Sequence, residues 1–96
     1  MRLTLDSAVY RLDAVKKAAY RFIDRFAIDI RLENGSVVCD LIFSPHMTEE
    51  VRTALVVDFR KEILDQDLRE RISEETAAVR NAILAVAFAP VSSRGD

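Results

Sequence analysis

Two aspartates on neighbouring predicted strands have the spacing that comes closest to a chemical site. If Asn34-Gly35 forms the turn of a hairpin, Asp29 and Asp40 lie directly opposite each other. Paired carboxylates can transfer protons or bind a metal ion, but neither a histidine nor a third acid joins them in the sequence. We therefore expect a solvated face on which Arg31, diagonal to Asp40, relieves the repulsion between the two carboxylates.

The single histidine and the single cysteine offer no alternative site. His46 follows a proline in a predicted loop and has no ligand or nucleophile beside it. Cys39 is predicted to point inward from a strand, where a thiol behaves as a small apolar side chain rather than as a reactive thiolate. Phosphate-binding glycine loops and Cys/His metal spacings are absent from the sequence. We predict no catalytic residue, no metal site, no cofactor and no enzymatic activity.

Length and composition limit the classes of protein to consider. Ninety-six residues, half of them hydrophobic, fit one domain with a small core. A net charge of −2 argues against nucleic acid as a partner, because such proteins usually carry a basic face. Without a signal peptide or an apolar run near the ~20 residues that span a bilayer, we expect a cytoplasmic protein that does not bind membranes. The expected division is a single α+β domain at 1–90 and a flexible tail at 91–96.

Alternating apolar and polar residues predict three strands. Leu3 and Leu5 alternate with polar neighbours near the start of the chain, and residues 26–33 and 36–43 alternate on either side of the predicted turn. The two-residue turn sets the pairs on the core face: Leu32 with Val37, Ile30 with Cys39, Ile28 with Leu41, and Phe26 with Phe43.

The opposite face of this hairpin is partly apolar. Ala27 lies across from Ile42, and Val38 lies between that pair and the turn. An exposed apolar patch often marks a binding site for a partner protein. The alternative interpretation is that a further element of the same chain covers this face.

A change to spacings of three and four residues predicts helices. The first helix begins at Leu12, and the second follows Thr48 as its N-cap. The second helix has an additional apolar stripe that needs a cover, formed by Ala54, Val57 and Leu64. We predict that a last helix, with Ser73 as its N-cap, packs on this stripe; a partner chain is the alternative cover.

The segment 62–76 between these helices is itself predicted to be helical. Its apolar residues recur every four positions, and two acid-before-base pairs support the helix, Asp65–Arg69 and Asp67–Arg71. A strand at 68–72 remains open as an alternative, although alternation would then direct the carboxylate of Glu70 inward, which is costly.

The predicted order is strand, helix, strand, strand, helix, helix, which indicates an α+β fold of ferredoxin-like style. We expect the third strand to insert between the first two, giving an antiparallel sheet with the helices packed on one face. A fourth strand at 68–72 would complete the sheet beside the first strand. Without it, the first strand is an edge that another chain could extend.

Asp65 and Leu68-Arg69-Glu70 carry a resemblance to a known family. When Glu70 is aligned with the last residue of the pattern, they match the signature Leu-Leu-Asn-Asp-Tyr-any-Leu-Arg-Glu of the small D component of the bacterial His-Xaa-Ser system. Glu62, Leu64 and Gln66 depart from that signature. Other segments of the chain are also similar to the family: Val9-Tyr10, 16–20, Glu75-Thr76, Val79-Arg80 and Ala87-Phe88.

The resemblance implies a context rather than an activity. Such proteins are encoded beside two radical S-adenosylmethionine enzymes and a protein with His-Xaa-Ser repeats, which suggests peptide or protein modification. We therefore expect a non-catalytic accessory protein that contacts a radical S-adenosylmethionine enzyme or the repeat-bearing substrate. The alternative is a self-associating structural module, a homodimer. The residues expected to bind the partner are Val38, Ile42, Leu68, Arg69 and Glu70.

Overall fold

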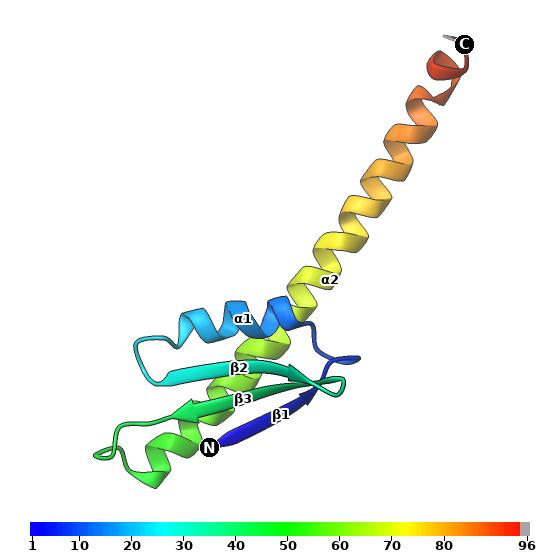
Figure 1. Cartoon of the computed structure of the whole chain (residues 1–96). Coiled ribbons are helices and arrows are strands. Elements are labelled where there is room, and N and C mark those ends of the chain that lie inside the picture. Colours follow the sequence, from blue (N-terminus) through cyan, green and yellow to red (C-terminus); the bar gives the residue numbers. More distant parts are fainter. Residues whose placement is uncertain (95–96) are drawn as a thin grey trace.

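The computed structural model describes the backbone of residues 1–94 and the side chains of residues 1–86. It confirms the α+β class (Figure 1). The elements are β1 (Arg2–Asp6), α1 (Leu12–Arg21), β2 (Ala27–Glu33), β3 (Ser36–Ile42) and α2 (Glu49–Arg94). The boundary predicted at residue 90 and the flexibility of 91–96 stay predictions: the backbone is helical to Arg94, and residues 95 and 96 lie outside the described part.

The three strands form an antiparallel sheet in the order β1-β3-β2, which confirms that the third strand inserts between the first two. Both helices lie on the same face of this sheet (Figure 1). Apolar side chains from that face and from both helices form one core, whose largest fully buried members are Phe59, Leu41, Ile63, Val15, Val37 and Cys39.

The β2–β3 hairpin has the predicted turn and register. Asn34 and Gly35 both adopt positive φ angles, 48° and 77°, as a type I′ turn requires. The strand pairs include Leu32 with Val37, Ile30 with Cys39 and Ile28 with Leu41. Leu32 is nevertheless exposed, because it lies next to the turn and outside the group of side chains that pack on the core.

Phe59 of α2 joins the helical layer to the end of the hairpin. Its ring is fully buried and lies edge-on to the rings of Phe22 and Phe26, at centroid distances of 5.6 and 5.7 Å. Phe26 in turn contacts Phe43, which follows β3, at 5.2 Å. Edge-to-face aromatic pairs of this kind stabilise a core beyond the area that they bury. The position of α2 over the sheet therefore depends on a small aromatic cluster.

The helix α2 corrects two expectations for the second half of the chain. It is one continuous helix of 46 residues, so the separate last helix beginning after Ser73 is wrong, as is the strand considered at 68–72. Thr48 caps its start as predicted, since its Oγ1 accepts a hydrogen bond from the N–H of Val51 at 3.3 Å. The helix continues through Ser73 because neither glycine nor proline occurs between Glu49 and Pro90.

The unbroken helix makes the molecule elongated. At about 1.5 Å per residue, the 46 residues of α2 are about 69 Å long, and the longest dimension of the molecule is 69 Å. The C-terminal half of α2 projects away from the sheet and α1 (Figure 1). We call residues 72–86 of α2 the arm. Since no last helix folds back, the second apolar stripe of α2 stays uncovered: Val57 and Leu64 are exposed, as are the large apolar residues of the arm.

Neither α1 nor α2, within the described residues, is both long and apolar enough to cross a membrane.

Candidate functional site

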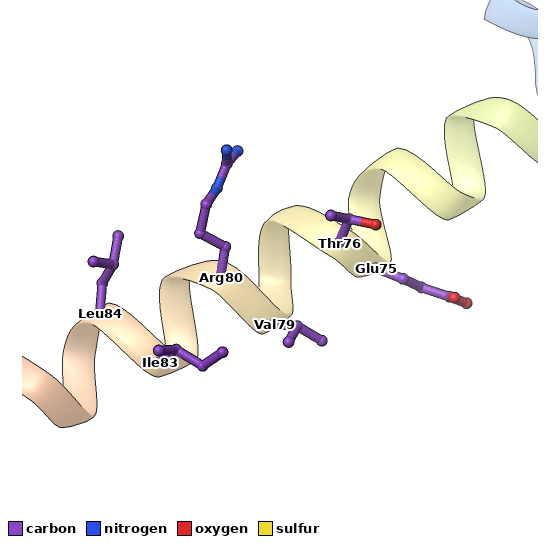
Figure 2. Close-up of a pocket in the computed structure, with 6 residues that line it drawn as sticks. All are labelled: Glu75, Thr76, Val79, Arg80, Ile83 and Leu84. Atoms are coloured by element: carbon purple, nitrogen blue, oxygen red, sulfur yellow. The ribbon is translucent and has the colours of Figure 1, made fainter.

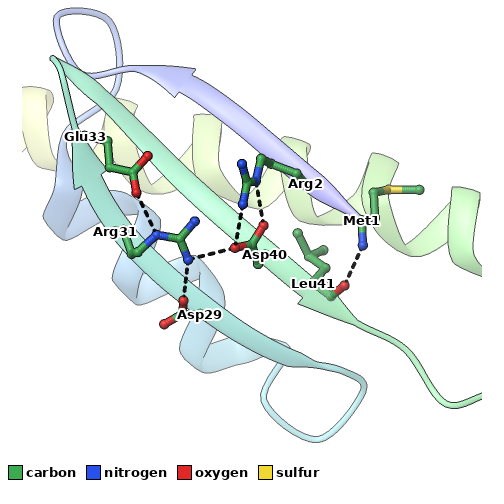
Figure 3. Close-up of polar contacts among 7 residues, drawn as sticks. All are labelled: Met1, Arg2, Asp29, Arg31, Glu33, Asp40 and Leu41. Atoms are coloured by element: carbon green, nitrogen blue, oxygen red, sulfur yellow. Dashed lines mark hydrogen bonds and ion pairs between the residues drawn. The ribbon is translucent and has the colours of Figure 1, made fainter.

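The two aspartates that face each other across the hairpin are held in an ion-pair network on the outer face of the sheet (Figure 3). Asp29 and Asp40 are direct partners in the β2–β3 register. Nη1 of Arg31 lies 2.6 Å from the carboxylate of Asp29 and 2.7 Å from that of Asp40, while its Nε donates to Glu33 at 2.9 Å. This contact agrees with the expectation that Arg31 relieves the repulsion between the aspartates.

A second arginine completes the network. Nε of Arg2 on β1 donates to Asp40 at 2.9 Å, so this carboxylate links all three strands. Hydrogen bonds from Arg2 and Arg31 lower the pKa of Asp40 to about 2. A carboxylate that stays ionised at neutral pH between two arginines is a poor proton carrier. Among the described residues there is also no cluster of three or more potential metal ligands. The network therefore serves to join the strands.

The cysteine and the histidine lie where the sequence placed them. Cys39 is fully buried in the central strand, and burial raises the pKa of its thiol to about 11. His46 is exposed in the turn between β3 and α2. The buried thiol of Cys39 lacks the exposed, cationic setting of a reactive thiolate.

Sequence reasoning missed the role of Asp67, which fixes α2 to the start of α1. This buried carboxylate accepts a hydrogen bond from the backbone N–H of Arg11, the N-cap of α1, at 3.0 Å. Its other oxygen accepts one from Nε of Arg71 at 2.7 Å, and Arg71 also donates to the carbonyl of Val9 at 2.9 Å. The guanidinium of Arg11 pairs with Glu74. The acid-before-base pairing around Asp67 was visible in the sequence, but its burial was not.

The ionisation of Asp67 is set by two opposing effects. Burial raises the pKa of its carboxyl, whereas the hydrogen bonds from Arg71 and from the N–H of Arg11 lower it. The hydrogen bonds prevail, so the pKa lies below its ordinary value and Asp67 is charged at neutral pH.

The four residues that match the family signature lie beside this contact on α2. Glu70 pairs with Lys17 of α1 at 2.8 Å, and Arg69 pairs with Asp65 one turn earlier at 2.8 Å. Leu68 is about half exposed on the same helix. Glu70 thus joins the two helices, while Leu68 and Arg69 lie on the surface.

The other two residues predicted to bind a partner lie on the opposite side of the sheet from α2. Val38 is buried on the outer face between its strand neighbours Thr4 and Arg31. Ile42 is 64% exposed at the end of β3. The structure therefore places the five predicted residues on two separate surfaces and does not bring them together.

A small apolar hollow that the sequence analysis did not identify lies between α1 and the free edge of β2. It has a volume of about 220 Å³, below the 300–1,000 Å³ typical of small-molecule sites. It is lined by Lys16, Ala19, Tyr20, Ile23, Phe26 and Ile28. Tyr20 and Ile23 are largely exposed, although both are large apolar side chains next to a core. In helical spacing their positions differ from those of the buried residues of α1, Ala14, Val15 and Ala18, and this was the available signal in the sequence.

The chain was compared with models of known protein families, with curated proteins and with solved structures. The family model described as "His-Xaa-Ser system protein HxsD" matches residues 5–94, which covers all five elements from β1 to α2. Searches of the curated proteins and of the solved structures return no match.

Proposed function

Because the chain belongs to the HxsD family of His-Xaa-Ser system proteins, we propose that it is a non-catalytic accessory protein of that system. Its role is to hold an extended segment of the repeat-bearing substrate at the free edge of β2. The observation that carries this proposal is the apolar hollow beside that edge. A radical S-adenosylmethionine enzyme of the same system would then act on the held segment.

The free edge of β2 can provide the main-chain part of such a contact. Within the described residues, β2 pairs only with β3. In an antiparallel ladder, the backbone groups of every second residue point away from the paired strand. These N–H and C=O groups are available to an added strand, which is a common mode of peptide recognition.

The hollow can provide the side-chain part of the contact. Added strands gain affinity from their main-chain hydrogen bonds and specificity from pockets that take alternate side chains. The hollow opens next to Ile28 of β2 and has the exposed ring of Tyr20 at its rim. Its volume suits one side chain rather than a cofactor. In an extended His-Xaa-Ser repeat, alternation directs every second histidine to the same face, and an imidazole can pack against this ring.

The β1 edge is a weaker candidate for the same role. It is also unpaired on one side among the described strands, but the apolar hollow that carries this proposal is lined by Ile28 of β2 and by no residue of β1. Main-chain hydrogen bonds alone discriminate poorly between sequences, so a specific substrate favours the β2 edge.

Two isoleucines of similar exposure allow a matched test. Ile23 at the hollow is 70% exposed, and Ile42 on the outer face of the sheet is 64% exposed. The probe is a fluorescein-labelled synthetic peptide of three His-Xaa-Ser triplets taken from the repeat protein of the same system. Its binding is measured by fluorescence anisotropy with the full-length protein and with the variants Ile23→Asp and Ile42→Asp.

We expect the peptide to bind the wild type and Ile42→Asp with similar affinity. Ile23→Asp should weaken binding at least tenfold, because a desolvated carboxylate replaces an apolar contact, about 1.4 kcal/mol or more. Circular dichroism checks that both variants keep their helix content. Weaker binding of Ile42→Asp alone would place the peptide on the outer face and overturn the assignment to the edge. Absence of binding by the wild type would overturn the proposal.

A further inference from the structure

The arm of α2 carries an apolar stripe that the rest of the chain leaves exposed. We define the arm stripe as Ile72, Thr76, Val79, Ile83 and Val86. Its four large apolar side chains are all at least half exposed. Figure 2 shows Glu75, Val79 and Ile83 along one side of the arm, with Arg80 and Leu84 projecting on the other side.

The spacing of the arm stripe is that of a two-stranded coiled coil. Its successive residues are separated by four, three, four and three positions. This alternation is the heptad pattern of core positions, which keeps an apolar seam facing a second helix. A helix that packs on a sheet or in a helical layer usually has a wider apolar face. The pattern therefore favours one further helix as the cover of the arm stripe.

Charges beside the arm stripe specify both the partner and its direction. Glu75 flanks the stripe on one side and Arg80 flanks it on the other. In a parallel, in-register pair of identical helices, a residue on one flank lies nearest to the residue about five positions later on the other helix. Glu75 of each copy then lies beside Arg80 of its partner, and the pair forms twice. An antiparallel pair brings like flanks together and loses this complementarity.

The position of the arm stripe leaves room for the globular end of a second copy of the chain. At about 100° per residue, the arm stripe lies roughly 180° around α2 from the residues that face the domain, Phe59, Ile63 and Asp67. Glu70 and Glu74, which pair with α1, lie on that domain-facing side as well. Two arms can therefore pair along their exposed sides without contact between the two sheets.

We propose that the protein forms a parallel homodimer through the arm stripe, with the globular ends of both copies at the same end of the paired arms. The occupant of the stripe is a second copy of this chain. This inference is independent of the peptide site at the β2 edge, which lies on the globular end and stays accessible in both copies. Such a dimer presents two peptide sites at the same end of the paired arms, one on either side of them, to a substrate with repeated triplets.

Sedimentation equilibrium and light scattering on a sizing column test the dimer. The chain mass is 10.9 kDa, so a dimer has twice that mass, about 22 kDa. We expect the wild type to be dimeric at micromolar concentration and Ile83→Asp to be monomeric. Ile23→Asp is the matched control, because Ile23 is 70% and Ile83 63% exposed but only Ile83 lies on the arm stripe. That control should remain a dimer.

A charge exchange tests the direction of the arms. Glu75→Arg and Arg80→Glu each place like charges across the pair, and we expect each homodimer to dissociate about tenfold more readily. A mixture of the two variants should form a heterodimer with restored affinity, because both cross-pairs are then complementary. The absence of restoration would refute the parallel arrangement. A wild type that is monomeric alone, or that associates only with the radical enzyme, would refute the homodimer.

Discussion

Replacement of Asp67 by alanine should destabilise the protein far more than replacement of Asp65, although the two residues look alike in the sequence. Each aspartate has an arginine four positions later, Arg71 and Arg69 respectively. The two ion pairs are similar in length, at 2.7 and 2.8 Å. They differ in their surroundings, because Asp67 is buried and also accepts the N–H of Arg11 at 3.0 Å, while Asp65 is about half exposed.

The expected size of the difference follows from these contacts. An exposed pair at i,i+4 contributes about 0.3–0.5 kcal/mol, which is the expected cost of Asp65→Ala. A hydrogen bond to a charged group contributes about 1.5–3 kcal/mol, and Asp67 accepts two. Arg71 is partly exposed and regains water when its partner is lost, whereas the N–H of Arg11 stays unsatisfied. We therefore expect Asp67→Ala to cost about 2–4 kcal/mol.

Urea unfolding followed by circular dichroism measures both losses. A domain of this size has about 5–15 kcal/mol of stability, so both variants should still fold. The slope of the unfolding free energy with urea should stay constant, which would attribute a shift in midpoint to stability alone. Equal losses for Asp65→Ala and Asp67→Ala would refute the argument that burial distinguishes the two pairs.

Asp67→Asn separates the charge from the hydrogen bond. The amide oxygen still accepts the N–H of Arg11, but the charge opposite Arg71 is lost. Because the pKa of Asp67 in the folded protein lies below its ordinary value of 3.8, the charged form stabilises the fold. This contribution is complete above the ordinary pKa and is lost as the pH falls through the folded pKa. The difference between wild type and Asp67→Asn should therefore shrink below about pH 4. A difference that is constant with pH would contradict this assignment.

Two further predictions concern the hairpin. Gly35→Ala should destabilise the protein by about 1–2 kcal/mol, because a φ angle of 77° strains a residue with a Cβ atom; an unchanged urea midpoint would contradict the turn geometry. Cys39 should react with 5,5′-dithiobis(2-nitrobenzoic acid) at pH 8 only after unfolding in guanidinium chloride, because it is buried and its pKa is raised to about 11. Reaction of the folded protein at the rate of free cysteine would contradict its burial.

Family membership and the two proposed surfaces suggest how this component of the His-Xaa-Ser system is organised. The chain belongs to the HxsD family, and the described residues contain no metal-ligand cluster. The proposed peptide site lies at the β2 edge, while the proposed dimer contact lies along the arm. A variant can disturb one surface and leave the other intact, so the two proposals can fail separately.

The local features of the fold could be predicted from the sequence because they depend on neighbours in the chain. Asn34-Gly35 favours a type I′ turn by its own backbone preferences, and that turn sets the register that brings Asp29 opposite Asp40. Alternation of apolar residues in the strands then identified the core face. The resemblance of Leu68-Arg69-Glu70 to a family signature likewise needed only a short segment, and the match over residues 5–94 confirms it.

The features that only the tertiary structure decided depend on segments far apart in the chain. Spacing could not tell Asp65 from Asp67, because the difference comes from Arg11, which lies 56 residues away from Asp67 in the sequence. Ser73 has the character of an N-cap, yet it lies inside α2, because an N-cap begins a new helix only where the preceding chain has left the helical conformation. Local sequence thus determined the elements, and long-range packing determined which of their faces were left exposed for a partner.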